Sequence, residues 1–231
     1  YADLLPVEAP DEPRLAPGFT PLVPAPRLAE VVGVRELWLK LDTANPTHSF
    51  KDRVVAVAAR KAQELGFDGV TSNSLDAVGD RVPVVAAIAS MTTADACAQA
   101  VQAESSGCAG LMVLPPYVYR SDWREMKAHI EAVFRATKLS CMLYNNPVAY
   151  GTDFLPQQIA ELASTHENFE AVKESSTDVR RITWIRELLD DKLAIFVGVD
   201  DVIVEGVLMG AVGWIAGLVN ALPRESVDLF N

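Results

Sequence analysis

The sequence predicts an α/β protein in which parallel strands alternate with helices. Three observations support this: six short apolar runs follow Arg81, a stretch with helical character follows each run, and half of the 231 residues are apolar. Two fold classes fit, an open doubly wound sheet and a TIM barrel, the (βα)8 fold. Two further candidate βα units before Arg81 bring the count to eight, the number that closes a barrel.

The expected elements after Arg81 follow in order. The apolar runs that we expect to be strands are 82–89, 110–115, 139–144, 169–173, 193–198 and 212–219. The stretches that we expect to be helices are 93–106, 121–136, 156–165, 178–191, 201–209 and 223–230. Several helices have typical N-terminal residues, such as Thr92 before Asp95, Asp122 before Glu125, and proline at 156 and 223.

The first third of the chain is less regular. Proline is frequent in residues 1–27, and we expect residues 1–30 to form an extended arm. Residues 36–42 alternate between apolar and polar side chains, which indicates a strand, and Ser49 opens a predicted helix. The expectation is a barrel-like, incomplete (βα)8 domain that starts near residue 34.

Composition excludes several classes of partner. The net charge is −11 without a basic stripe, so we expect no nucleic acid partner. No apolar run approaches the length of a membrane span. Cys97, Cys108 and Cys141 lie in apolar surroundings, as reduced, buried thiols of a cytoplasmic protein do. The chain starts without Met and ends at Asn231 inside a predicted helix, so we expect a fragment or an engineered boundary.

Two residues at strand ends are candidates for chemistry, because parallel α/β folds place their sites at the carboxyl ends of strands. Lys173 ends a strand expected to be covered by helices, where loss of hydration favours a neutral, nucleophilic amine. Tyr144 ends a neighbouring strand and can relay protons. From residue types alone, the favoured interpretation is a lysine that reaches solvent at the rim, with Tyr144 as a core aromatic residue. There is no GxGxxG motif, no phosphate loop and no metal-ligand spacing.

Six motifs after residue 76 carry a family resemblance: GDRVPVVAAIAS, GLMVLPPYVYRS, MLYNNPVAYG, AVKESSTDVRRI, FVGVDD and GAVGWIAGLVNALPRE. In this order and spacing they resemble the dihydrodipicolinate synthase/N-acetylneuraminate lyase superfamily, whose fold is the TIM barrel. The resemblance implies that Lys173 forms a Schiff base with pyruvate or a related 2-oxo acid, with Tyr144 as proton relay. It implies that Tyr117, Gly198 and Ile215 line the substrate site. It implies a class I carbon–carbon or carbon–oxygen lyase, such as an aldolase, that needs no cofactor.

Three departures from the family pattern narrow the substrate. Ala149 stands where the synthase has an arginine that holds a second carboxylate. Val118 stands where the family has the second tyrosine of a pair, which enters a neighbouring subunit's proton relay. The loop that binds the 2-oxo carboxylate is replaced by residues 69–73. Dihydrodipicolinate synthase itself is therefore not expected, whereas sugar-acid dehydration and hydroxyproline-type pyrroline carboxylate deamination remain open.

A second resemblance covers residues 1–68. GFTPL, LWLKLD and NPTHSFKDR are similar to the N-terminal part of threonine synthase, which implies Lys51 as a pyridoxal phosphate lysine. We therefore divide the chain into a threonine-synthase-like segment, 1–68, and a Schiff-base lyase barrel portion, 69–231. Two alternatives to the lyase remain, an inactive chimeric or truncated scaffold and a pyridoxal phosphate enzyme that uses Lys51. An incomplete barrel exposes apolar strand edges, which favours homo-oligomers.

Overall fold

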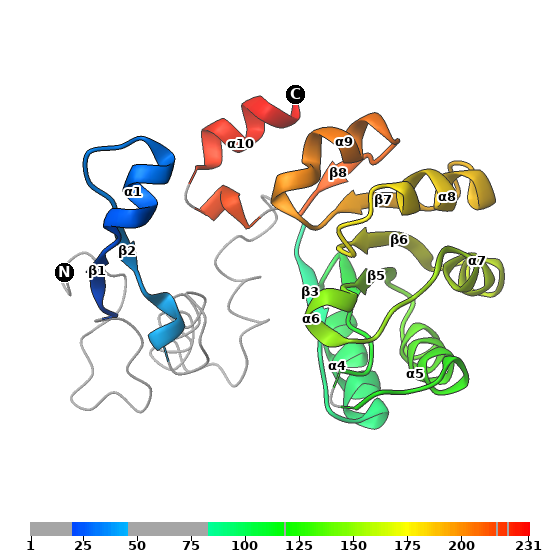
Figure 1. The fold of residues 1–231 in the computed structure, drawn as a ribbon. Helices are drawn as coiled ribbons and strands as arrows, with labels where there is room; N and C mark the ends of the chain where they lie inside the picture. Colours follow the sequence, from blue (N-terminus) through cyan, green and yellow to red (C-terminus); the bar gives the residue numbers. More distant parts are fainter. Residues whose placement is uncertain (1–19, 46–82, 118, 216, 221) are drawn as a thin grey trace, which may run out of the picture. The chain divides into compact units, whose positions relative to one another are not determined.

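The computed structural model describes residues 20–45, 83–117, 119–215, 217–220 and 222–231 (Figure 1). The chain divides into two units, Tyr1–Ala77 and Val78–Asn231. The predicted helix that starts at Ser49, the residues Lys51 and Val118, and the segment 69–73 lie outside the described residues. The predicted boundary between residues 68 and 69 also lies there and stays a prediction.

The first unit contains a small antiparallel sheet. Strand β1 (Leu22–Pro24) pairs with β2 (Trp38–Lys40), and Val23 lies opposite Leu39. Helix α1 (Pro26–Val32) connects the two strands, and the short 3-10 helix η2 (Asp42–Ala44) follows β2. Proline at the first turn of α1 has the fixed φ that a helix start needs, and Gly33 ends the helix in the left-handed region with φ 76°.

This sheet corrects two predictions. Residues 20–30 are not an extended arm, because they include β1 and most of α1. The strand predicted at 36–42 exists as β2, but it pairs with β1 in its own sheet and is not a barrel strand. Proline frequency suggested extended chain, whereas the pairing of β1 with β2 is a contact between distant residues that local composition does not encode.

The second unit is built on a six-stranded parallel sheet in the order β3-β4-β5-β6-β7-β8. The strands are β3 (Val85–Ile88), β4 (Gly110–Val113), β5 (Ser140–Asn145), β6 (Phe169–Glu174), β7 (Ala194–Val197) and β8 (Gly213–Trp214). The helical segments are α4 (Thr93–Ser105), α5 (Trp123–Arg135), α6 (Pro147–Tyr150), α7 (Pro156–Thr165), α8 (Arg180–Leu189), η4 (Asp200–Val202), α9 (Ile203–Leu208), η5 (Leu218–Asn220) and α10 (Pro223–Phe230). All six strands and six helices predicted after Arg81 are present, and α7 and α10 have the predicted bounds. Strands β5 and β6 end one residue later than predicted, whereas the strand predicted at 212–219 is reduced to Gly213–Trp214.

The helix starts follow from the local sequence. The Thr92 hydroxyl accepts a hydrogen bond from the backbone N–H of Asp95 (3.1 Å), and the Asp122 carboxylate accepts one from that of Glu125 (2.9 Å). These caps satisfy backbone N–H groups at the starts of α4 and α5. They confirm the N-terminal signals predicted for these two helices.

The core of this unit lies between the sheet and its helices. Figure 1 shows α4, α5, α7 and α8 along the outer side of the curved sheet. Fully buried side chains from the two layers meet there, among them Ala100, Ile130, Leu143, Leu162, Val172 and Ile185. One face of the strands is buried against the helices, whereas the alternate residues of β3, β5 and β7 are only half-buried or exposed.

Strand order decides between the two fold classes. A doubly wound sheet reverses its strand order at a switch point, whereas β3 to β8 follow one another in sequence order, as in a barrel wall. Strands β3 and β8 form the two edges of this sheet, which is therefore a partial TIM barrel within the described residues. Among those residues, no helix is long and apolar enough to cross a membrane.

Candidate active site

Lys173 and Tyr144 lie side by side at the carboxyl ends of two paired strands. They are register partners in the pairing of β6 with β5. The Lys173 Nζ atom lies 4.1 Å from the centre of the Tyr144 ring, and the lysine is only 9% exposed. The negative face of an aromatic ring stabilises a positive charge at this nitrogen, whether ammonium or iminium.

Gly198 provides the space for the lysine side chain. It directly follows β7, and its N–H donates to the carbonyl of Glu174 on β6 (2.9 Å). A methyl group on Gly198 would lie 2.8 Å from Lys173 Cε and 1.9 Å from Ser175 Oγ. Only a residue without a Cβ therefore fits beside the lysine as the structure places it.

Ser175 is a buried hydroxyl next to the lysine. Ser175 directly follows β6, and a Cβ on Gly198 would meet both its Oγ and the Lys173 side chain, so the two side chains lie close together. The serine is 2% exposed, and its Oγ has no hydrogen-bond partner among the described residues. An unsatisfied buried hydroxyl costs about 1–3 kcal/mol. A polar ligand beside Lys173 would supply the missing partner.

Asn146 contacts the hydroxyl of Tyr144, and two further tyrosines, Tyr150 and Tyr117, follow from its ring. Asn146 Nδ2 donates to the Tyr144 hydroxyl (3.0 Å). The rings of Tyr144 and Tyr150 meet edge to face with centroids 5.8 Å apart, and Tyr117 lies 5.9 Å from Tyr150. Burial, followed by the proximity of Tyr144 and Tyr117, raises the pKa of Tyr150 above its ordinary value. The predicted site residue Tyr117 thus approaches Tyr144 through Tyr150.

A buried polar network joins the ends of β5 and β6 next to these residues. Asn145 Nδ2 donates to the carboxylate of Glu174 (3.0 Å), and the backbone N–H of Ser176 donates to its other oxygen (2.7 Å). The Asn145 side chain also accepts from the N–H of Phe154 (3.0 Å). These contacts fix the two strand ends that carry Tyr144 and Lys173.

Glu174 is a carboxyl group in an apolar setting. Burial raises its pKa, although the hydrogen bonds from Asn145 and Ser176 oppose that shift. Nearby, the guanidinium of Arg181 pairs with Asp153 (2.5 Å) and lowers the pKa of that carboxyl. Successive strand residues face opposite sides, so this network lies on the side of β6 away from Lys173.

The sequence-predicted residues are only partly brought together. Lys173, Tyr144 and Gly198 form one group, and Tyr117 joins it through Tyr150. Ile215 follows β8, one strand beyond β7, where its N–H donates to the carbonyl of Val197 (2.9 Å). Lys51 lies outside the described residues, so its predicted role is untested.

Three residues that sequence reasoning did not single out belong to this site: Asn146, Tyr150 and Ser175. A signal was available for the first two. Asn146 before Pro147, followed by Gly151, is the pattern of a short capped helix, and Asn146 Oδ1 does accept from the N–H of Ala149 (3.0 Å) at the start of α6. The lack of a partner for Ser175 has no sequence signal.

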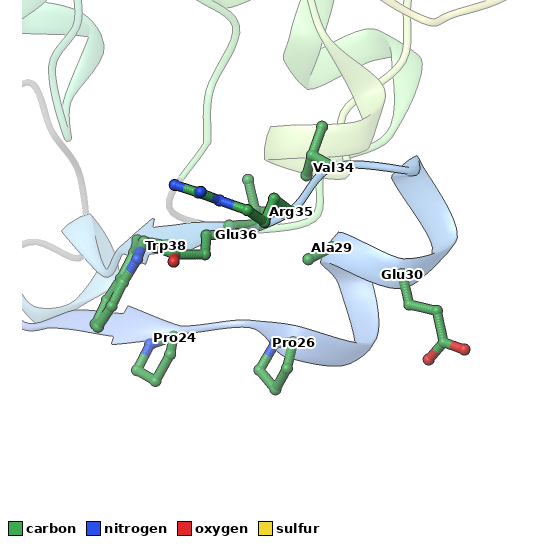
Figure 2. Close-up of a pocket in the computed structure, with 9 residues that line it drawn as sticks. Pro24, Pro26, Ala29, Glu30, Val34, Arg35, Glu36 and Trp38 are labelled. Atoms are coloured by element: carbon green, nitrogen blue, oxygen red, sulfur yellow. The ribbon is translucent and has the colours of Figure 1, made fainter.

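A separate pocket lies in the first unit, between α1 and the segment that leads into β2 (Figure 2). Its volume is about 260 Å³. Its lining residues are Pro24, Pro26, Ala29, Glu30, Val34, Arg35, Glu36, Leu37 and Trp38. No lysine is among them, so this pocket has no amine that could form a Schiff base.

Fold and site together define a class, a TIM-barrel protein with a buried lysine beside a tyrosine at the carboxyl ends of its strands. The family model of the dihydrodipicolinate synthetase family matches residues 68–231, and the chain belongs to this family. The model of the pyridoxal-phosphate dependent enzyme family matches residues 13–115, in line with the threonine-synthase-like segment.

Individual relatives agree with this assignment. The 4-hydroxy-tetrahydrodipicolinate synthase of Clostridium tetani is 31% identical over 156 residues, which are 68% of this chain and 53% of the relative. That of Geobacter metallireducens is 30% identical over 172 residues, 73% of this chain and 59% of the relative. The crystal structure of dihydrodipicolinate synthase from Aquifex aeolicus has 26% identity and a TM-score of 0.67, with 70% of this chain and 55% of that one covered. The chain thus spans somewhat more than half the length of these relatives.

Proposed function

We propose that the chain is a class I lyase that forms a Schiff base between Lys173 and pyruvate or a related 2-oxo acid. The observation that carries this proposal is the buried Lys173 amine 4.1 Å from the Tyr144 ring, at the strand ends of a family barrel. Burial limits hydration of the amine, and the ring stabilises the positive charge that an imine carries when protonated.

The chemistry uses two groups of the chain. The neutral amine of Lys173 attacks the C2 carbonyl carbon of the 2-oxo acid, and loss of water leaves a neutral imine, which takes up a proton from water to become the protonated imine. The imine draws electrons from the neighbouring carbon, so C3 loses a proton and an enamine forms. Tyr144 carries protons to and from the imine and the substrate. Reaction of the enamine with a second carbonyl compound, or the reverse, gives a carbon–carbon lyase.

The substrate is a 2-oxo acid without a second carboxylate near Ala149. In the synthase this position carries an arginine for that carboxylate, whereas here Ala149 is the exposed third residue of α6. Sugar-acid dehydration and deamination of a pyrroline carboxylate both satisfy this condition. Gly198 supports the role of Lys173, because a side chain at this position would displace the lysine, with a Cβ only 2.8 Å from Lys173 Cε.

Reductive trapping tests the proposal. Intact-mass spectrometry after borohydride reduction with pyruvate is expected to show one adduct per chain, and Lys173→Ala should lose it. Lys192→Ala is the matched control, because Lys192 is exposed in the turn before β7. An adduct that persists in Lys173→Ala would rule out this assignment. Complete lack of an adduct would favour the inactive chimeric or truncated scaffold.

The pyridoxal phosphate alternative depends on Lys51. No observation on the described residues favours it, because neither a phosphate cradle nor a partner for the ring nitrogen has been identified among them. An internal aldimine absorbs visible light, so addition of pyridoxal phosphate and a spectrum decide the matter. We expect no such absorbance.

A further inference from the structure

The hydroxyl of Tyr144 has one partner whose role is fixed by chemistry. The amide nitrogen of Asn146 can only donate, so its 3.0 Å contact uses the Tyr144 oxygen as an acceptor. The phenolic proton of Tyr144 can therefore be given to another group. A relay at Tyr144 needs such a group, which takes up this proton and passes one on.

Tyr150 is placed to be that group. Its ring stands at 88° to the Tyr144 ring with the centroids 5.8 Å apart, and a side-chain hydrogen bond with Tyr144 contributes to its raised pKa. Both ends of α6 are fixed, by the Asn146 cap at the start and by Gly151 with φ 67° at the end. The same short helix thus brings the Asn146 amide and the Tyr150 phenol to Tyr144.

Tyr117 is the third tyrosine of a row that starts with Tyr144 beside Lys173 and continues with Tyr150. Its ring centroid lies 5.9 Å from that of Tyr150, at an interplanar angle of 49°. The three phenols come from β5, from α6 and from the segment after β4, and each is half-buried. The row therefore starts beside Lys173 and keeps contact with solvent.

We propose that Tyr150 is the proton-relay partner of Tyr144 within the same chain. This inference rests on the proposed function of Lys173. When Tyr144 takes the proton from C3 of the imine, it gives its own phenolic proton to the Tyr150 oxygen. Tyr150 passes its proton to Tyr117 or to water, so each oxygen gains one proton and loses one. The residue at the family's second tyrosine position, Val118, has no hydroxyl, and an internal partner makes a phenol from a second copy unnecessary.

The pKa of Tyr150 fits this role. Burial raises it above the ordinary value near 10, so Tyr150 remains a neutral phenol at neutral pH. A neutral phenol both donates and accepts, which a relay requires, whereas a phenolate only accepts. Tyr150 acts through Tyr144 and is thus a positioning and relay residue that need not touch the substrate.

Two rates measured on Tyr150→Phe test the inference. One is imine formation, from borohydride trapping with pyruvate. The other is exchange of the pyruvate methyl protons in D2O, followed by proton NMR. Trapping should match the parent, whereas exchange should fall by about 100-fold, the lower end of the range for a lost acid–base group. Tyr119→Phe is the matched control, because Tyr119 is 50% exposed, and it should change neither rate.

The outcomes separate the two proposals. Exchange at the parent rate with trapping intact overturns the relay and leaves the Lys173 function standing. A fall of both rates by the same factor overturns it too, because Tyr150 is then only structural. No adduct in the parent overturns the proposed function and the relay with it. If circular dichroism shows that Tyr150→Phe is unfolded, Tyr150→His keeps a ring that exchanges protons and should retain methyl exchange, and loss of exchange in a folded His variant would overturn the relay.

Discussion

Substitution of Gly198 by alanine tests whether Lys173 needs the space beside it. The new Cβ would lie 1.9 Å from Ser175 Oγ and 2.8 Å from Lys173 Cε, whereas ordinary contacts begin at 3.4 Å. Ser175 Oγ must therefore move by at least 1.5 Å and Lys173 Cε by at least 0.6 Å. Overpacking of this kind costs about 1–3 kcal/mol of folding free energy. Misplacement of a reacting group by about 1 Å can reduce a rate about 100-fold, so imine formation should fall by up to that factor.

The assay is the rate of borohydride-trapped adduct with pyruvate, measured beside a thermal melt. Gly206→Ala is the matched control, because its Cβ would lie 2.4 Å from Val197 Cγ2. That clash also crowds β7, but it involves Val197, which alternates with Gly198 and faces the other side of the sheet. Both variants should melt at lower temperature, and only Gly198→Ala should lose the adduct. If Gly198→Ala forms the adduct at the parent rate, the reasoning about this site is wrong.

Three further predictions concern buried groups. In Glu174→Gln an amide NH2 replaces one carboxylate oxygen and faces another donor, the Asn145 amide or the Ser176 N–H. The free energy of unfolding, measured with denaturant, should therefore fall by about 1–3 kcal/mol. An unchanged midpoint of unfolding would contradict this prediction. Burial lowers the pKa of His129, so the unfolded chain binds a proton at this histidine at higher pH than the folded chain does. The free energy of unfolding should therefore fall as the pH drops below about 6.5, the pKa of histidine in an unfolded chain. The variant His129→Gln should show a smaller dependence of that free energy on pH. Burial raises the pKa of the Cys141 thiol to about 12, so iodoacetamide at about pH 8 should label it only in denaturant, and rapid labelling of the folded chain would contradict this.

The regular part of the fold was predictable because its signals are local. Thr92 and Asp122 cap their helices as their sequence neighbours indicate, and apolar runs mark the strands. Strand order was accessible only through the family resemblance, since alternating βα units also fit a doubly wound sheet. The pairing of β1 with β2 was not accessible, because the alternation in residues 36–42 indicates a strand but not its partner on the other side of α1.

The residues of the candidate site also fall into two groups, those that the sequence indicated and those that only the structure revealed. Lys173 and Tyr144 stand at strand ends and could be identified from the sequence, since strand ends of parallel sheets meet at one edge. The orientation of Tyr150 depends on how α6 folds back toward β5, and the missing partner of Ser175 depends on the position of Gly198. Both are consequences of tertiary packing, which no motif in a single sequence specifies.

Peptide mapping of the reduced pyruvate adduct tests the central claim most directly. The protein is reduced with borohydride in the presence of pyruvate and digested, and the modified lysine is identified by tandem mass spectrometry. Our account predicts a single modified site at Lys173. A modification at Lys51, a spread over exposed lysines, or an unmodified Lys173 would contradict it.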